Sequence, residues 1–80
     1  MQIKPAWVEI NHTYKFWQGS GFIVKVQAIR RGIPDRRSTE ELEFVLSTIF
    51  PNGVHLSYIE LLALSELLAN IAETEQPRGD

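Results

Sequence analysis

Apolar and polar residues alternate along the first third of the chain with the period of a β-strand. One face of the run over residues 7–16 carries four apolar residues and a histidine: Val8, Ile10, His12, Tyr14 and Phe16. A second alternating run places its apolar residues at Phe22, Val24, Val26 and Ala28. The glycines of the segment Gln18-Gly19-Ser20-Gly21 between the two runs can adopt positive φ and close a tight turn. The pattern therefore predicts a β-hairpin.

The number of strands within residues 3–31 stays open. Asn11-His12 can also form a turn, which would divide the first run and give a three-stranded meander. The segment Arg31-Gly32-Ile33-Pro34-Asp35 ends the last of these strands, because Pro34 lacks a backbone donor and Gly32 weakens pairing.

Two helices are expected after the strands, each opened by a capping box. Ser38 with Glu41 begins the first, over about residues 39–50, whose apolar positions recur at helical spacing: Leu42, Val45, Leu46 and Ile49. Ser57 with Glu60 begins the second, over about residues 57–75, ahead of the helix breaker Pro77. Residues 76–80 are expected to form a tail.

The apolar arc of the C-terminal helix is unusually wide, roughly 200° against the roughly 100° of an ordinary surface helix. The apolar surface in excess of an ordinary stripe has three possible uses. It is buried between the hairpin and the first helix, contacts a second copy in a homodimer, or binds another protein. The residues that would form this core or dimer face are Leu61, Leu64, Leu68 and Ile71.

Together these elements predict one α+β domain spanning residues 1–80. A small antiparallel sheet of two or three strands is followed by two antiparallel helices packed on one of its faces. The absence of cysteine excludes disulfides and thiolate metal sites, so packing or a partner must stabilise the fold. No apolar stretch of signal-peptide or membrane-spanning length is present, which predicts a cytoplasmic protein.

The charge distribution is polarised although the net charge is only -2. Residues 1–37 carry seven Lys and Arg against Glu9 and Asp35, and residues 38–80 carry Arg78 against eight acids. Either the two halves neutralise each other, or the basic half faces an acidic partner.

The sequence contains no motif typical of a catalytic centre or a metal site. His12 and His55 have no ligand residue at metal-binding spacing, and no Gly-x-Ser-x-Gly segment provides a nucleophile. The glycines at Gly19 and Gly21 lack the following Lys-Ser/Thr of a phosphate-binding loop. We therefore expect neither an enzyme nor a bound metal or cofactor.

Binding to another macromolecule is the function that the residues favour. The candidates fall into two groups: the tryptophans, which alternate in phase with the polar residues of the first strand, and the basic residues of the hairpin and of the turn that follows it. They are Trp7, Lys15, Trp17, Lys25, Arg30, Arg31, Arg36 and Arg37. A protein partner is the leading hypothesis. The alternative is nucleic acid bound by the basic, aromatic hairpin, because the C-terminal helix has no Lys or Arg between Tyr58 and Glu75.

The back half of the chain resembles one of the small phage anti-CRISPR proteins. The resemblance covers the run Ser38-Thr39-Glu40-Glu41-Leu42-Glu43, the break at Pro51-Asn52-Gly53 and the last helix closed by Pro77. It implies a stoichiometric inhibitor that occupies a surface of a host nuclease or surveillance complex, and it assigns no functional residue. The sequence thus predicts a protein-binding module of the phage or bacterial inhibitor or adaptor type.

Overall fold

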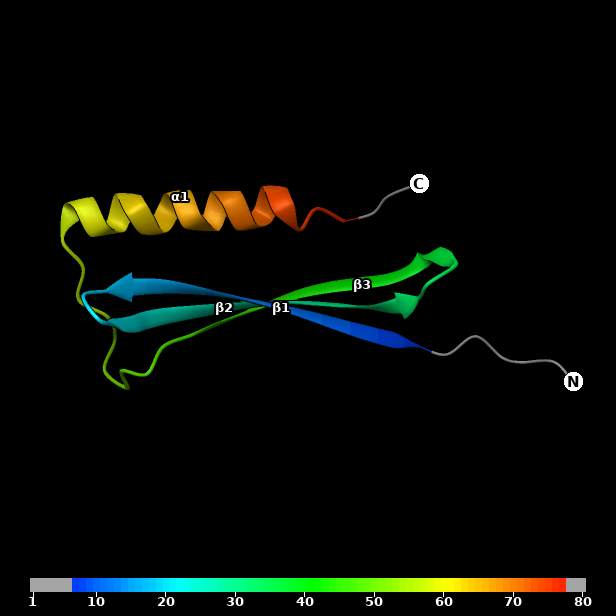
Figure 1. Cartoon of the computed structure of the whole chain (residues 1–80), viewed down its shortest axis with the longest axis horizontal. Coiled ribbons are helices and arrows are strands. Elements are labelled where there is room, and N and C mark those ends of the chain that lie inside the picture. The colour runs from blue at the N-terminus through cyan, green and yellow to red at the C-terminus, as the bar shows by residue number, and fades with distance from the viewer. Residues whose placement is uncertain (1–6, 78–80) are drawn as a thin grey trace, which may run out of the picture.

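The computed structural model describes residues 7–77, which form three strands and one helix. The strands are β1 (Val8–Gln18), β2 (Gly21–Ile33) and β3 (Arg36–Ser47), and the helix is α1 (Tyr58–Thr74). They form an antiparallel sheet in the order β1-β2-β3, with α1 lying along one face (Figure 1). β2 is therefore the central strand, and β1 and β3 are the two edges.

The predicted hairpin is confirmed. β1 and β2 pair from Val8 opposite Gly32 to Gln18 opposite Gly21, and Gly19 in the turn has a φ of 63°. β1 is continuous, so the alternative turn at Asn11-His12 is wrong, although the sheet does have three strands. Residues 3–6, included in the predicted strand region, lie outside the described residues.

The predicted helix over residues 39–50 is wrong, and with it the arrangement of two helices on a sheet. This segment forms β3, and a single helix follows. Its apolar residues fit both periods, because Leu42 and Leu46 are spaced for a helix face, while Leu42 and Phe44 alternate with Glu41 and Glu43 as in a strand. Pairing with β2 decides the outcome, since it satisfies backbone groups that β2 would otherwise expose as an edge.

The start of β3 is shaped by a hydroxyl and not by the predicted capping box at Ser38. Thr39 Oγ1 accepts the Ile33 backbone N–H at 2.9 Å and donates to the Arg36 carbonyl at 2.6 Å. The pairing of β2 with β3 shifts register here. Gly32 allows the close approach, because a Cβ at this position would lie 3.2 Å from the Glu40 Cα.

The C-terminal helix is confirmed, including its start. Ser57 accepts the Glu60 N–H at 3.1 Å, and the Glu60 carboxylate accepts the Ser57 N–H at 2.9 Å, which completes the capping box. α1 ends at Thr74, with Glu75 as its C-cap. Gln76 and Pro77 follow without regular structure, and the rest of the predicted tail, 78–80, lies outside the described residues.

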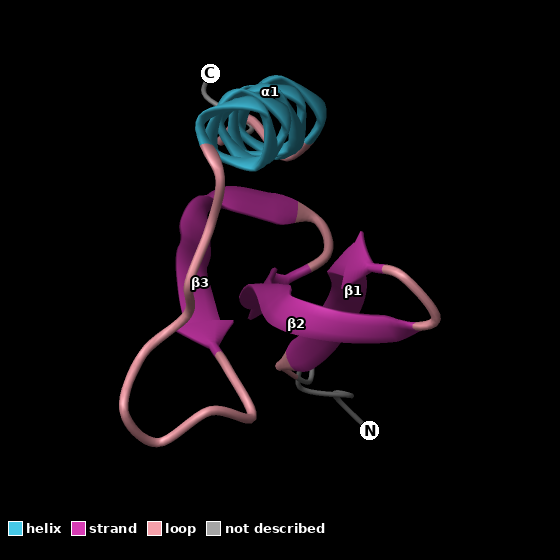
Figure 2. Ribbon diagram, turned by 90° about the vertical axis from the view of Figure 1, so that its left-hand side faces the viewer, coloured by secondary structure: helices cyan, strands magenta, loops and turns pink. Residues whose placement is uncertain are grey.

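The core is small and belongs mainly to β2 and α1. Its buried side chains are Ile23, Val24, Val26, Ala28 and Ile71. Partly buried residues from β1, α1 and the connection over residues 48–57 pack around it: Tyr14, Phe16, Val54, Leu56, Leu64 and Leu67. Figure 2 shows α1 as a single layer above the twisted sheet. Within residues 7–77, no helix has the length and apolar character that crossing a bilayer requires.

The capping box should contribute measurably to stability. Ser57→Ala leaves the Glu60 N–H without its side-chain acceptor, so we expect the free energy of unfolding to fall by about 1 kcal/mol. Urea denaturation followed by circular dichroism measures the change. Ser65→Ala is the matched control, because the Ser65 hydroxyl donates to a carbonyl within the helix and satisfies no terminal N–H. Equal effects of the two substitutions would contradict the role of the cap.

Candidate functional site

The face of the sheet opposite α1 is called here the outer face. His12 and Tyr14 contact Glu75 next to α1, so these positions of β1 point toward the helix. Because side chains alternate along a strand, Thr13, Lys15 and Trp17 point to the outer face.

Two lysines lie directly opposite each other on this face. Lys15 of β1 is the register partner of Lys25 of β2. Within the described residues, no carboxylate forms an ion pair with either ammonium group. Like charges directly opposite in an antiparallel pair destabilise the sheet. The fold therefore holds an unneutralised pair of cations.

Two aromatic rings adjoin Lys15, one member of the lysine pair. The Trp17 and Phe22 rings meet edge to face, with centroids 6.1 Å apart and planes at 82°. The Lys15 ammonium lies 4.9 Å from the Phe22 centroid and 6.0 Å from the Trp17 centroid. Trp17 nevertheless remains 56% exposed. We call Lys15, Trp17, Phe22 and Lys25 the Lys–aromatic patch.

Arg31, another predicted binding residue on this face, is neutralised by two carboxylates. Arg31 donates from Nε to Glu9 at 2.7 Å and from Nη1 to Glu43 at 3.1 Å. The hydrogen bond with Glu9, together with Glu43, raises the Arg31 pKa, and the Arg31 guanidinium lowers the pKa of Glu9. Arg31 is thus paired with two carboxylates, whereas Lys15 and Lys25 have no such partner among the described residues.

Arg30 lies on the helix-facing side and has a structural role. It forms an ion pair with Glu40 of β3, approaches Glu75 at 3.5 Å, and donates to the Gln76 carbonyl at 3.2 Å. Its side chain is almost fully covered. Arg30 therefore connects β2 to β3 and to the C-terminal end of α1, and its guanidinium is not available to a partner.

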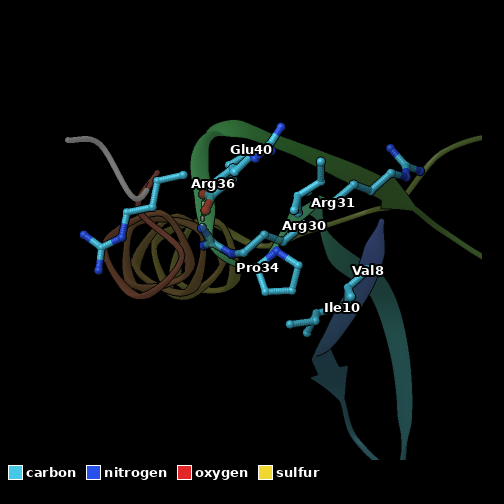
Figure 3. Close-up of a pocket in the computed structure, with 10 residues that line it drawn as sticks. Val8, Ile10, Arg30, Arg31, Pro34, Arg36 and Glu40 are labelled. Carbon is cyan, nitrogen blue, oxygen red and sulfur yellow. Dashed lines mark hydrogen bonds and ion pairs between the residues drawn. The ribbon is translucent and has the colours of Figure 1, made fainter. Parts of the chain in front are cut away.

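Arg36 and Arg37 lie at the end of the sheet where β2 turns into β3, far from the patch. They line a hollow of about 200 Å³ together with Pro34, Val8 and Ile10. Figure 3 shows Arg30 paired with Glu40 in this hollow, while Arg36 extends away from Val8 and Ile10. The four arginines that bracket the turn therefore do not form one charged edge.

Trp7 is also separated from the patch. It is exposed and precedes β1, ten residues from Trp17, which corresponds to roughly 33 Å along a strand. The structure thus brings together Lys15, Trp17 and Lys25 from the predicted set and adds Phe22, which sequence reasoning assigned to the apolar face. The irregular register between Phe16 and Trp17 places Phe22 opposite Trp17.

The predicted helix face divides into two parts. Leu64 and Ile71 belong to the core, whereas Leu61 and Leu68 are exposed on the flank of α1. Leu68 lines an apolar groove of about 200 Å³ between α1 and β3, whose other residues are Val26, Phe44, Leu46, Ile71 and Ala72. Sequence reasoning missed Phe44 and Leu46 as part of such a groove, and the alternation of Leu42 and Phe44 with Glu41 and Glu43 was the signal that could have placed them on one strand face.

Glu75 is a buried carboxylate that sequence reasoning also missed. Its Oε2 accepts the Tyr14 hydroxyl and contacts His12 Nδ1, both at 2.6 Å, and the residue is 4% exposed. The Tyr14 hydrogen bond is the main cause that lowers the Glu75 pKa, against a smaller opposing effect of burial. The same bond raises the Tyr14 pKa. These partners offset the cost of an anion at the negative end of a helix dipole.

Comparison of the chain with protein-family models, curated proteins and solved structures finds no match. The described residues contain no group of three or more His, Cys, Asp and Glu side chains that could hold a metal ion. The anti-CRISPR resemblance stays a prediction, and the run Ser38–Glu43 that carried part of it forms a strand.

The Glu75 contacts predict a pH-dependent contribution to stability. Since the folded pKa of Glu75 lies below its ordinary value of 4.5, the contribution is present above pH 4.5. It is lost as the pH falls from 4.5 through the folded pKa. We expect Glu75→Gln to lower the free energy of unfolding at pH 7, and the gap from wild type to narrow below pH 4.5. Urea titrations at several pH values measure this gap, and a constant gap would refute the assignment.

Proposed function

We propose that this chain is a non-enzymatic protein-binding module whose Lys–aromatic patch binds an acidic segment of a partner protein. The observation that carries the proposal is the direct opposition of Lys15 and Lys25 without a neutralising carboxylate among the described residues. A carboxylate supplied by a partner between the two ammonium groups would remove their repulsion. Binding therefore relieves a cost that the free sheet carries.

Trp17 supports the proposal because it combines a large ring with high exposure. Tryptophan is enriched among the residues that dominate protein interfaces, and burial of its exposed surface would add an apolar anchor to the charge contacts. Its contact with Phe22 holds the ring in place before a partner arrives, which reduces the entropy lost on binding.

The patch geometry favours a protein over the alternative, a nucleic acid. Base stacking needs open ring faces, and the edge-to-face contact of the two rings with the Lys15 ammonium over both reduces the ring face available to a base. Within residues 7–77, the two arginines without an ion pair are Arg36 and Arg37. They lie at the opposite end of β2 from the patch, so no continuous basic track follows the sheet.

Inhibitors and adaptors act by occupying a partner surface, and the patch is suited to that mode of action. We therefore include in the proposal that the chain acts as a phage or bacterial inhibitor or adaptor of the anti-CRISPR-like type. The partner chemistry that we infer is a short acidic stretch with an apolar residue that covers Trp17.

Fluorescence titration tests the proposal with defined probes. Trp7→Phe leaves Trp17 as the single tryptophan, which then reports directly on the patch. We expect a peptide of alternating Glu and Leu residues to shift the Trp17 emission. The substitutions Lys15→Ala and Lys25→Ala together should weaken its binding by about tenfold or more, because both cations that hold the carboxylates are removed.

The matched control removes the same charge elsewhere. Arg36→Ala with Arg37→Ala changes the net charge equally but leaves the patch intact, so binding should change by less than about twofold after correction for general screening. Equal losses in the two double variants would contradict the patch. Binding of oligothymidylate that is tighter than peptide binding, and that falls steeply with salt, would replace the protein proposal with the nucleic-acid alternative.

A further inference from the structure

The edge strand β3 ends in a segment that is apolar and exposed on both faces. Phe44 and Leu46 point toward the helix-facing side and are 46% and 62% exposed, and Val45 points to the outer face and is also exposed. β3 pairs with β2 along one edge only. The connection over residues 48–57 leaves from the Ser47 end and crosses that end of the sheet, so it does not run along the free edge of β3 (Figure 1).

Folded proteins protect such edges, because unpaired N–H and C=O groups beside apolar side chains attract another strand. β3 carries Glu41 and Glu43 toward its centre, but residues 44–47 have neither a charge nor a proline. On the helix-facing side, the groove between β3 and α1 extends the apolar surface through Leu68 and Ala72, and Leu61 extends it further along the helix. The strip is thus a contiguous exposed apolar surface rimmed by polar residues, the kind of surface that marks an interaction site.

We propose that this face is the interface between two copies of the chain. β3 pairs with β3 of a second copy in antiparallel orientation across a twofold axis at Phe44. The result is a continuous sheet of six strands with both copies of α1 on the same side, and the side chains of Phe44 and Leu46 fill the space between the helices. None of the four residues of the Lys–aromatic patch belongs to this surface, although Lys25 pairs with Ser47 at its end, so the inference does not rest on the proposed function.

The order of side chains in β3 selects a second copy as the occupant. A twofold interface needs a surface that is complementary to itself. With the axis at Phe44, Leu42 lies opposite Leu46 of the second copy and Phe44 lies opposite its own counterpart, all on the helix-facing side. The apolar residues on this side of β3 therefore meet only apolar residues.

The charges on the outer side fit the same register. With the axis at Phe44, Glu43 lies opposite Val45 of the second copy, and Glu41 lies opposite Ser47. An axis at Glu43 would place that residue opposite its own copy, and an axis at Leu42 would place Glu41 opposite Glu43. Like charges directly opposite each other are unfavourable in a sheet. The register centred on Phe44 avoids them and pairs all three apolar positions.

Sedimentation equilibrium tests the dimer with the full chain. We expect wild type to sediment at twice the 9.2 kDa chain mass at micromolar concentration. Leu46→Glu should raise the dissociation constant at least about a hundredfold, because it places a carboxylate against Leu42 of the second copy. The control Ile59→Glu changes a residue that is 77% exposed in the first turn of α1, outside the interface, and should stay dimeric.

Val45 tests the register with two substitutions of opposite charge. Opposite Glu43 of the second copy, Val45→Lys should preserve or tighten the dimer, and Val45→Glu should weaken it at least about fivefold relative to Val45→Lys. Circular dichroism on each variant establishes that it is folded. A monomeric wild type at high micromolar concentration would overturn the dimer. Equal weakening by Val45→Lys and Val45→Glu would overturn the register centred on Phe44.

Discussion

The position of α1 on the sheet depends on one buried carboxylate. Glu75 contacts β1 through His12 and Tyr14 and approaches β2 through Arg30, which pairs in turn with Glu40 of β3. The apolar core beneath the helix is small, since Ile71 is the one buried residue of α1 and Leu64 and Leu67 are only partly buried. Because the direct contacts of Glu75 are with β1 and β2, the helix is held over these strands, and the apolar side of β3 stays uncovered.

This placement leaves the two faces of the sheet with different properties. The outer face carries the lysine pair with Trp17 and Phe22, and the helix-facing side carries the apolar strip of β3 and α1. In the dimer that we propose, both Lys–aromatic patches lie on the outer face of one continuous sheet. A partner with two acidic segments would then bind the second patch at high effective concentration, so a weak single contact would become a strong one.

The sequence predicted the elements whose signals are local. The glycines at Gly19 and Gly21 and the capping box at Ser57 each act within a few residues, and the hairpin and α1 form as expected. β3 was predicted as a helix because Leu42 and Leu46 satisfy both periods, and only pairing with β2 distinguishes them. The same non-local pairing brings Lys15 next to Lys25, and helix docking brings Glu75 to Tyr14. The sequence therefore predicted Lys15, Trp17 and Lys25 as binding residues, but not which side chains lie next to each other in the fold.

The central claim is that a second copy covers the edge that a single helix leaves open. Amide hydrogen exchange along β3 tests it most directly, because strand pairing protects the N–H groups that point away from β2. The account predicts that alternate amides of residues 41–47 are protected at high protein concentration and exchange faster on dilution, while amides that bond to β2 do not change. Rapid exchange of the outward amides at every concentration would contradict it.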